Sequence, residues 1–444
     1  MLRRDLVVVL GAWITWIAAA AAALLIGHGF VLAVDLYSAA SRSVEAHTLL
    51  AGEFDPLLGI VRPTLGGLTL ALSLFGPIIG ARALAMEKER RTFHTALLRT
   101  GSAWRLVGRK WLAALTAVSL PVSAAAILVG LWRIVGGHVV MGETAIALGS
   151  HLLYAALFTS VGVAAAAFAR GVSQATTAAL LAVAITWAID ASDGFSALAW
   201  LVGAATWSPT TYLSSFEQGT LSLGSIGWFL GMTAGALAIA WAGCRFDLHG
   251  VRRLGATVGA IAILVATASI LRRLPGAWDV TEARRRSLPP AVVHELRAIE
   301  GPIQVVVNLD REDSRRRLIE SDAIAKLRLA RPDIDVRFPP DELGTPSAPA
   351  EDQRDDQYGR LTMRVGARSA VTTSNSRREI VGALLGLTGH PSPDWSQAQY
   401  PGYPLVIAGG KRTLILAASY VGVPLLFLVA GLAMTRNTPR RRTT

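Results

Sequence analysis

Long uncharged segments alternate with short charged ones along this chain. Eight stretches contain no Asp, Glu, Lys or Arg and approach or exceed the roughly 20 residues that a helix needs to cross a bilayer. They are residues 6–26, 63–81, 111–132, 144–169, 171–189, 218–244, 254–271 and 413–435. The pattern predicts a mostly α-helical polytopic membrane protein of about eight transmembrane helices. The first stretch has 21 uncharged residues, more than the core of a cleaved signal peptide, so we expect it to remain as a span.

The basic residues next to these stretches predict the orientation, because Lys and Arg accumulate on the cytoplasmic side. With both termini cytoplasmic, the short inner segments hold 18 basic residues and the short outer ones hold 3. Residues 194–216 are also uncharged, and counting them as a span would change the ratio to 11 against 10. They contain Pro209 and a Ser/Thr-rich run, so we interpret them as interfacial or re-entrant. We therefore expect a multi-pass cell-membrane protein with residues 272–412 outside the cytoplasm.

The segment between the last two spans has the mixed pattern of a water-exposed α/β domain. Apolar residues at helical spacing and short alternating runs predict a helix after Ser287, a strand at 303–309, a helix at 315–330 and a strand at 334–338. A strand, helix and second strand in this order imply a parallel pair. A strand pair at 361–365 and 370–373 and a helix at 378–387 complete it. Residues 339–357 are expected to form a loop, and 389–410 a Pro/Gly-rich linker.

Composition narrows the function classes. The chain is 52% hydrophobic and only 17% charged, unlike an ordinary soluble enzyme. The formal net charge of +12 lies largely beside the spans, without a nucleic-acid motif, so anionic lipids rather than nucleic acid are the expected counter-charge. Cys244 is the only cysteine, which excludes an intrachain disulfide. Nothing in the composition calls for a cofactor.

The most highly charged short connection lies between the second and third stretches, at residues 87–110. We expect a helix over 87–100 with Phe93, Leu97 and Thr100 on one face. It could be an interfacial helix whose cations bind lipid headgroups. Glu87 and Glu89 favour a protein partner instead, because anionic headgroups would repel both carboxylates.

This segment resembles the first cytoplasmic segment of ABC-2 type permeases. The matching positions are Glu87, Glu89, Thr92, Phe93, Leu97, Leu98, Thr100, Trp104 and Lys110, while Arg91 stands where the family usually has Gly. Ser208, Pro209, Phe216 and Gly219 are similar to the family's segment before its sixth span. The resemblance implies a coupling helix that docks on a separate ATP-binding subunit through Glu87, Glu89, Thr92, Phe93 and Leu97. It also implies a second permease copy or a paralogue.

The expected outer domain is similar to the auxiliary protein of gliding-motility-type ABC transporters. Asp279, Thr281, Ser287 and Leu288 match that family before its first helix, and residues 378–388 resemble its late helix. Together the resemblances imply a six-helix ABC-2 permease domain at 1–253, a seventh helix at 254–271, an α/β auxiliary domain at 272–412, and a last helix with a basic tail at 413–444.

No catalytic motif is complete in the sequence. A phosphate-binding loop requires Gly-Lys followed by Ser or Thr, but Gly410-Lys411 is followed by Arg412. Neither the histidine pattern of a zinc protease nor the glycine-flanked serine of a hydrolase occurs. We therefore expect no enzyme, but the membrane subunit of a transporter for an unidentified substrate. The alternative is a non-transport membrane scaffold whose outer domain recruits an envelope protein.

A few polar and small residues within the spans are further candidates. We expect His151 to bond to a neighbouring helix rather than to carry protons, and Glu143 and Asp190 to be hydrated at outer span ends. Gly227, Gly231 and Gly235 recur every fourth residue, a spacing at which helices approach closely. They mark either packing within one bundle or a dimer interface.

Overall fold

The computed structural model describes residues 2–44, 56–192, 204, 206–245, 250–274, 276–284, 287–310, 313–339, 357–390 and 405–436. The chain forms two compact units. The first comprises residues 1–187, 208–278 and 399–444, and the second comprises 188–207 and 279–398. The last helix of the chain therefore groups with the first unit.

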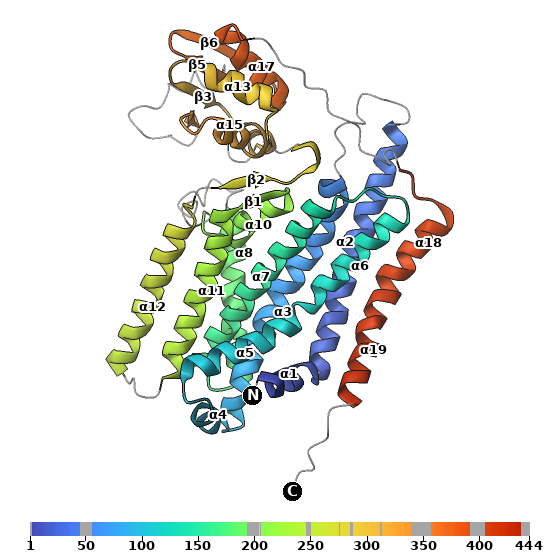
Figure 1. The fold of residues 1–444 in the computed structure, drawn as a ribbon, viewed down its shortest axis with the longest axis vertical. Coiled ribbons are helices and arrows are strands. Elements are labelled where there is room, and N and C mark those ends of the chain that lie inside the picture. The colour runs from blue at the N-terminus through green and yellow to red at the C-terminus, as the bar shows by residue number, and fades with distance from the viewer. Residues whose placement is uncertain are drawn as a thin grey trace. The chain divides into compact units, whose positions relative to one another are not determined.

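The first unit is a bundle of long apolar helices (Figure 1). Among the described residues, eight helical segments are long and apolar enough to cross a membrane, which confirms the predicted number. They are Trp13–Arg42, Leu57–Glu89, Ala103–Ile134, Met141–Phe168, Val172–Ala191, Leu223–Cys244, Gly250–Leu271 and Gly409–Arg436. The corresponding helices are α2 (Trp13–Val44), α3 (Arg62–Glu89), α5 (Ala103–Val118) with α6 (Leu120–Ile134), α7 (Met141–Phe168), α8 (Val172–Ser192), α11 (Leu223–Cys244), α12 (Gly250–Leu271), and α18 (Gly409–Ala417) with α19 (Val423–Arg436).

The predicted boundaries of the first span were wrong. A separate short helix, α1 (Leu2–Leu10), precedes α2, and the chain breaks the helix at Gly11 and Ala12. The hydroxyl of Thr15 donates to Val9 O at 2.7 Å, so polar groups at the break are satisfied locally. The uncharged stretch 6–26 therefore covers the end of one helix and only the first half of the next.

Glycines allow α3 and α7 to approach closely. A Cβ added to Gly80 on α3 would lie 2.3 Å from the carbonyl oxygen of Thr159, and one added to Gly162 on α7 would lie 2.2 Å from that of Pro77. Real Cβ atoms do not come this close to backbone atoms, so both positions require glycine. Sequence reasoning did not single out either residue, although Gly80 follows Gly76 at the four-residue spacing that lets helices approach closely.

The last span packs against the first. A Cβ added to Gly27 on α2 would lie 2.6 Å from the carbonyl oxygen of Ser419, and His28 Nδ1 lies 2.9 Å from the hydroxyl of Tyr420. Before α18, the N–H of Ile407 donates to Ser38 Oγ at 2.9 Å. Contacts before and after α18 therefore tie the last spanning segment to α2.

The second unit contains a four-stranded mixed sheet in the order β4-β3-β5-β6. The strands are β3 (Ile303–Val307), β4 (Asp335–Arg337), β5 (Leu361–Val365) and β6 (Arg368–Thr372). The helices are α13 (Pro290–Ala298), α14 (Ser314–Leu318), α15 (Ala325–Ala330) and α17 (Arg377–Thr388), and a π-helical turn at Ile319–Ile324 joins α14 to α15. As predicted, β3 and β4 are parallel, and β5 and β6 form an antiparallel pair.

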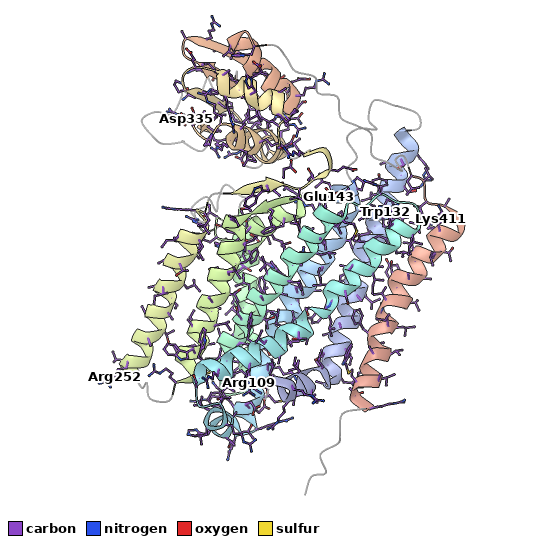
Figure 2. The ribbon with its side chains drawn as sticks, viewed as in Figure 1. Arg109, Trp132, Glu143, Arg252, Asp335 and Lys411 are labelled. Carbon is purple, nitrogen blue, oxygen red and sulfur yellow. The ribbon has the colours of Figure 1, made fainter. Side chains whose placement is uncertain are left out.

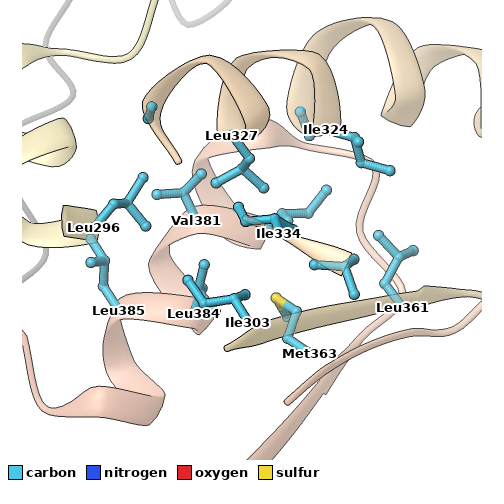
Figure 3. Packing of buried hydrophobic residues seen from close by; sticks show 14 of the residues in the cluster. Leu296, Ile303, Ile324, Leu327, Ile334, Leu361, Met363, Val381, Leu384 and Leu385 are labelled. Atoms are coloured by element: carbon cyan, nitrogen blue, oxygen red, sulfur yellow. The ribbon is translucent and has the colours of Figure 1, made fainter. Parts of the chain in front are cut away.

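The core of this unit lies between the helices and one face of the sheet (Figure 3). Ile303 on β3 is opposite Val365 on β5, and the alternate residues of both strands are buried with them. Leu296, Leu327, Val381 and Leu384 from the helices complete the same cluster. The intervening strand residues are half-buried or exposed, as expected for an antiparallel pair covered on one side.

Several predicted connections lie partly outside the described residues. These are the interfacial segment at 194–216, the loop at 339–357 and the linker at 389–410. Within the first of them, α10 (Pro209–Glu217) is described, and the hydroxyl of Ser208 accepts from the N–H of Thr210 at its N-terminus. A short strand β1 (Thr220–Ser222) follows and pairs with β2 (Ala277–Asp279).

Candidate functional site: the charged end of the helical bundle

Residues 87–100 belong to two helices rather than one: the end of α3 and a separate short helix. The helix expected over 87–100 was wrong, because α3 ends at Glu89 and a separate helix, α4 (Phe93–Thr100), follows. Between them Arg91 adopts a left-handed conformation with φ of 58°. The N–H of Thr92 donates to Glu87 O at 2.8 Å and that of Arg91 to Lys88 O at 3.0 Å, the paired bonds that close many helices. This conformation favours glycine, the residue usual at this position in the resembled family, so Arg91 is a strained departure from that pattern.

Helix α4 is anchored to the bundle by Phe93. Its side chain is buried, with 7% of the residue exposed, in a cluster that includes Leu84 of α3, Leu106 of α5, Val163 of α7 and Ala240 of α11. Leu97 is half-buried against the same cluster. Phe93 therefore anchors α4, a helix of only 8 residues, in a buried cluster that four spanning helices share.

The opposite side of α4 is exposed. Leu98 is 76% exposed, and Trp104 at the start of α5 is 50% exposed. Gly101 ends α4 in a left-handed conformation with φ of 67°, and turns the chain into α5. We call the exposed side chains of this region the α4 face; they are His94, Thr95, Leu98, Arg99, Trp104 and Arg105. Large apolar side chains among cations are typical of a protein-binding surface.

Glu87 belongs to an ion-pair network inside the chain. Its Oε1 atom lies 2.6 Å from Lys110 Nζ, and its Oε2 accepts from the hydroxyl of Thr92 at 2.5 Å. Lys110 is 6% exposed and also pairs with Asp5 of α1 at 3.0 Å, while Arg109 Nε donates to Asp5 at 3.2 Å. Figure 2 shows Arg109 at the end of the bundle where α4 and α1 lie. Sequence reasoning missed Asp5, although a lone carboxylate at the edge of an apolar stretch signals such a partner.

Lys88 and Glu89 bind the turn between α7 and α8. Lys88 Nζ donates to Ala167 O at 2.6 Å and to Ala169 O at 3.2 Å, at the C-terminal end of α7. Glu89 Oε2 accepts from the N–H of Val172, the first residue of α8, at 3.3 Å. A cation at a helix C-terminus and a carboxylate at a helix N-terminus are both favoured by the helix dipole. Lys88 therefore satisfies the C-terminal end of α7, and Glu89 satisfies the N-terminal end of α8.

The three glycines of α11 face α12 within the same chain. A Cβ added to Gly227 would lie 2.9 Å from the side chain of Leu271, and one added to Gly235 would lie 2.2 Å from that of Leu264. Gly231 lies against Ala268 in the same way, with a Cβ at 3.3 Å. This face is therefore occupied by packing inside the bundle.

A buried polar group lies toward the other end of the bundle. His151 is fully buried, with Nε2 3.0 Å from the hydroxyl of Thr69 on α3 and 3.6 Å from a carboxylate oxygen of Glu217. This contact agrees with the expected bond to a neighbouring helix. Burial raises the pKa of the Glu217 carboxyl, and the neighbouring Arg62 acts in the opposite direction. The expected hydration of Glu143 was wrong, because this residue is 4% exposed, whereas Asp190 is half-buried.

In the second unit, hydrogen bonds connect the residues that carried the second resemblance. One carboxylate oxygen of Asp279 accepts from the N–H of Thr281 at 3.0 Å and from its hydroxyl at 2.5 Å. The other accepts from the N–H of Ser287 at 2.5 Å. Leu288 is buried next to them, and helix α13 begins at Pro290, after Ser287 as predicted. Asp279 therefore shapes the entry into the domain and has a structural role.

Within the described part of the chain, no group of three or more His, Cys, Asp or Glu residues could hold a metal ion. No family model matches the chain, and no curated protein or solved structure is significantly similar to it. The charged end consists of a surface of apolar side chains and cations over a buried ion-pair network.

Proposed function

We propose that this chain is the membrane subunit of an ATP-driven transporter of the ABC-2 type, which couples ATP hydrolysis on a separate subunit to movement of a substrate. The observation that carries the proposal is α4, a short helix at the end of the bundle with one buried side and one exposed side. Bundle packing alone does not explain the exposed Leu98 and Trp104. Docking of a second protein explains both.

The buried side of α4 provides a route for motion into the bundle. Phe93 belongs to a buried cluster formed by residues of α3, α5, α7 and α11, so displacement of α4 would act on a cluster that several spanning helices share. The ion pairs of Lys110 with Glu87 and Asp5 connect the same end of α3 and α5 to α1. In this scheme Phe93 and Leu97 transmit the motion, and the α4 face makes the contact with the ATP-binding subunit.

The remaining parts of the proposal concern orientation and assembly. The distribution of basic residues supports a cytoplasmic position for α4 and an extracytoplasmic position for the α/β unit. A second permease copy or a paralogue would complete the pathway. The α/β unit would then serve as an auxiliary domain that binds a partner or a substrate.

Co-purification tests the docking step. The substitution Leu98→Asp on the α4 face should weaken association with the ATP-binding subunit by roughly tenfold or more, as expected when a central apolar contact of an interface is lost. The matched control is Ile134→Asp, because Ile134 is 77% exposed, against 76% for Leu98, and ends α6 at the other end of the bundle. Equal binding by wild type and the Leu98 variant would remove α4 as the docking element and favour the non-transport scaffold.

A further inference from the structure

A basic cavity lies beside α4, next to the exposed α4 face, with which it shares only His94. It has a volume of about 610 Å³ and is lined by the ends of α3, α7 and α11, the start of α4 and the turn after α7. Five of the lining residues are basic: Lys88, Arg91, His94, Arg170 and Arg245. No described lining residue is a carboxylate. The wall of the cavity therefore favours an anion.

Contacts within the fold account for part of this charge. Lys88 binds the C-terminal carbonyls of α7, and the guanidinium of Arg245 lies 5.1 Å from the ring centre of Trp241. Arg91 and Arg170 differ, because both are exposed and neither makes an ion pair in the part of the chain that the structure describes. The carboxylate of Glu89 on α3 accepts from the N–H of Val172 at the N-terminus of α8. Fold stability thus gives no reason for placing both arginines at this cavity.

The position of the cavity indicates the kind of anion. The spanning helices α7 and α11 end at its wall, so the cavity lies where headgroups would meet these helices in a bilayer. Phe168, the last residue of α7, also lines it and is 46% exposed. An apolar ring next to several cations suits a ligand with a phosphate and an acyl chain better than a free ion.

We propose that this cavity binds the phosphate headgroup of an anionic phospholipid, with Arg91 and Arg170 contacting the phosphate and Phe168 contacting the start of an acyl chain. Basic pockets between spanning helices have the chemistry to bind such headgroups. The bound lipid would join α3, α4 and α7 at their common end. The proposal does not depend on docking of an ATP-binding subunit, and its test requires only this chain.

The test measures lipid binding by the purified full-length chain in a neutral detergent, with native mass spectrometry and thermal shift as readouts. The probes are short-chain phosphatidylglycerol, short-chain phosphatidylcholine and inorganic phosphate. The cavity variant is Arg91→Gln with Arg170→Gln. The control, Arg90→Gln with Arg99→Gln, removes the same charge from the same end outside the cavity.

We expect wild type to prefer phosphatidylglycerol over both other probes, and the cavity variant to bind it on the order of tenfold more weakly. The control should bind like wild type. Equal losses in the two variants would overturn the site in favour of general surface charge. Binding of inorganic phosphate as tight as that of the lipid would show a site for a free anion, and no preference for phosphatidylglycerol over phosphatidylcholine would also refute the proposal.

Discussion

Single residues at the charged end of the bundle act mainly by satisfying helix ends. Arg91 closes α3 in a left-handed conformation, Lys88 binds the end of α7 and Glu89 binds the start of α8. Sequence alone suggests surface charges available to a partner. The contacts show that part of this charge holds the connection in place, so the variants most informative about docking are those of the α4 face.

The substitution Arg91→Gly should stabilise the protein. A left-handed conformation costs a non-glycine residue roughly 1 kcal/mol, and glycine removes that cost at the expense of some chain entropy. We expect a net gain of about 0.5 kcal/mol, seen as a higher midpoint of thermal unfolding in neutral detergent. The control is Arg90→Gly, where φ is −80°, so glycine brings no relief and should lower the midpoint. A lower midpoint for both variants would contradict the interpretation.

Glu87 and Glu89 look equivalent in the sequence but should respond differently to charge reversal. Glu87→Lys would place a second cation next to Lys110, which is 6% exposed, and should destabilise the fold by on the order of 2–3 kcal/mol. Glu89→Lys removes one hydrogen bond of 3.3 Å at an exposed helix end and should cost less. Thermal unfolding of the two variants gives the comparison, and equal losses would mean that the network around Lys110 contributes little.

At the scale of helices, the close approach of α3 and α7 determines the packing of the bundle centre. Gly162→Ala would place a Cβ 2.2 Å from the carbonyl oxygen of Pro77, so the helices must separate, at a cost of about 1–3 kcal/mol. Gly149→Ala on the same helix is the control, because no atom lies within 4 Å of the added Cβ. It should raise stability by about 0.5–1 kcal/mol through helix propensity. If Gly162→Ala and Gly149→Ala changed the free energy of unfolding in detergent in the same direction, the result would argue against this close packing.

The sequence predicts helices and strands well but not where they end. The eight uncharged stretches correspond to the eight spanning segments, because burial in lipid excludes unpaired charge over a long run. The observed helix boundaries differ from the predicted ones because charged residues at helix ends find partners within the chain. Glu87 pairs with Lys110 and Lys88 binds a backbone carbonyl of α7, so α3 continues to Glu89. The break between α1 and α2 was missed because it contains no charge or proline. A lone carboxylate such as Asp5 signals that a partner exists, but its partner Lys110 lies far away in the sequence and cannot be identified from a local pattern.

For the whole molecule, the predicted orientation can be tested by labelling. In a Cys244→Ser background, single cysteines at Ser369 and Ser376 in the α/β unit should react with an impermeant maleimide in intact cells. Both positions are exposed, and the native Cys244 is buried, so the background change should be mild. A cysteine at the exposed Thr95 on α4 should react only after lysis. Labelling of Thr95→Cys in intact cells, with no labelling of the cysteines at 369 and 376, would show that the orientation is the reverse of the predicted one.

The central claim is that α4 couples this chain to ATP hydrolysis on another subunit. The most direct measurement is phosphate release by the purified chain, by the candidate ATP-binding subunit and by their complex in lipid vesicles, with Leu98→Asp and Ile134→Asp variants measured in parallel. We predict no hydrolysis by the chain alone, higher turnover in the complex than in the isolated subunit, and loss of that increase in the Leu98 variant only. Strong turnover by the chain alone, or an equal increase in wild type and the Leu98 variant, would contradict the account.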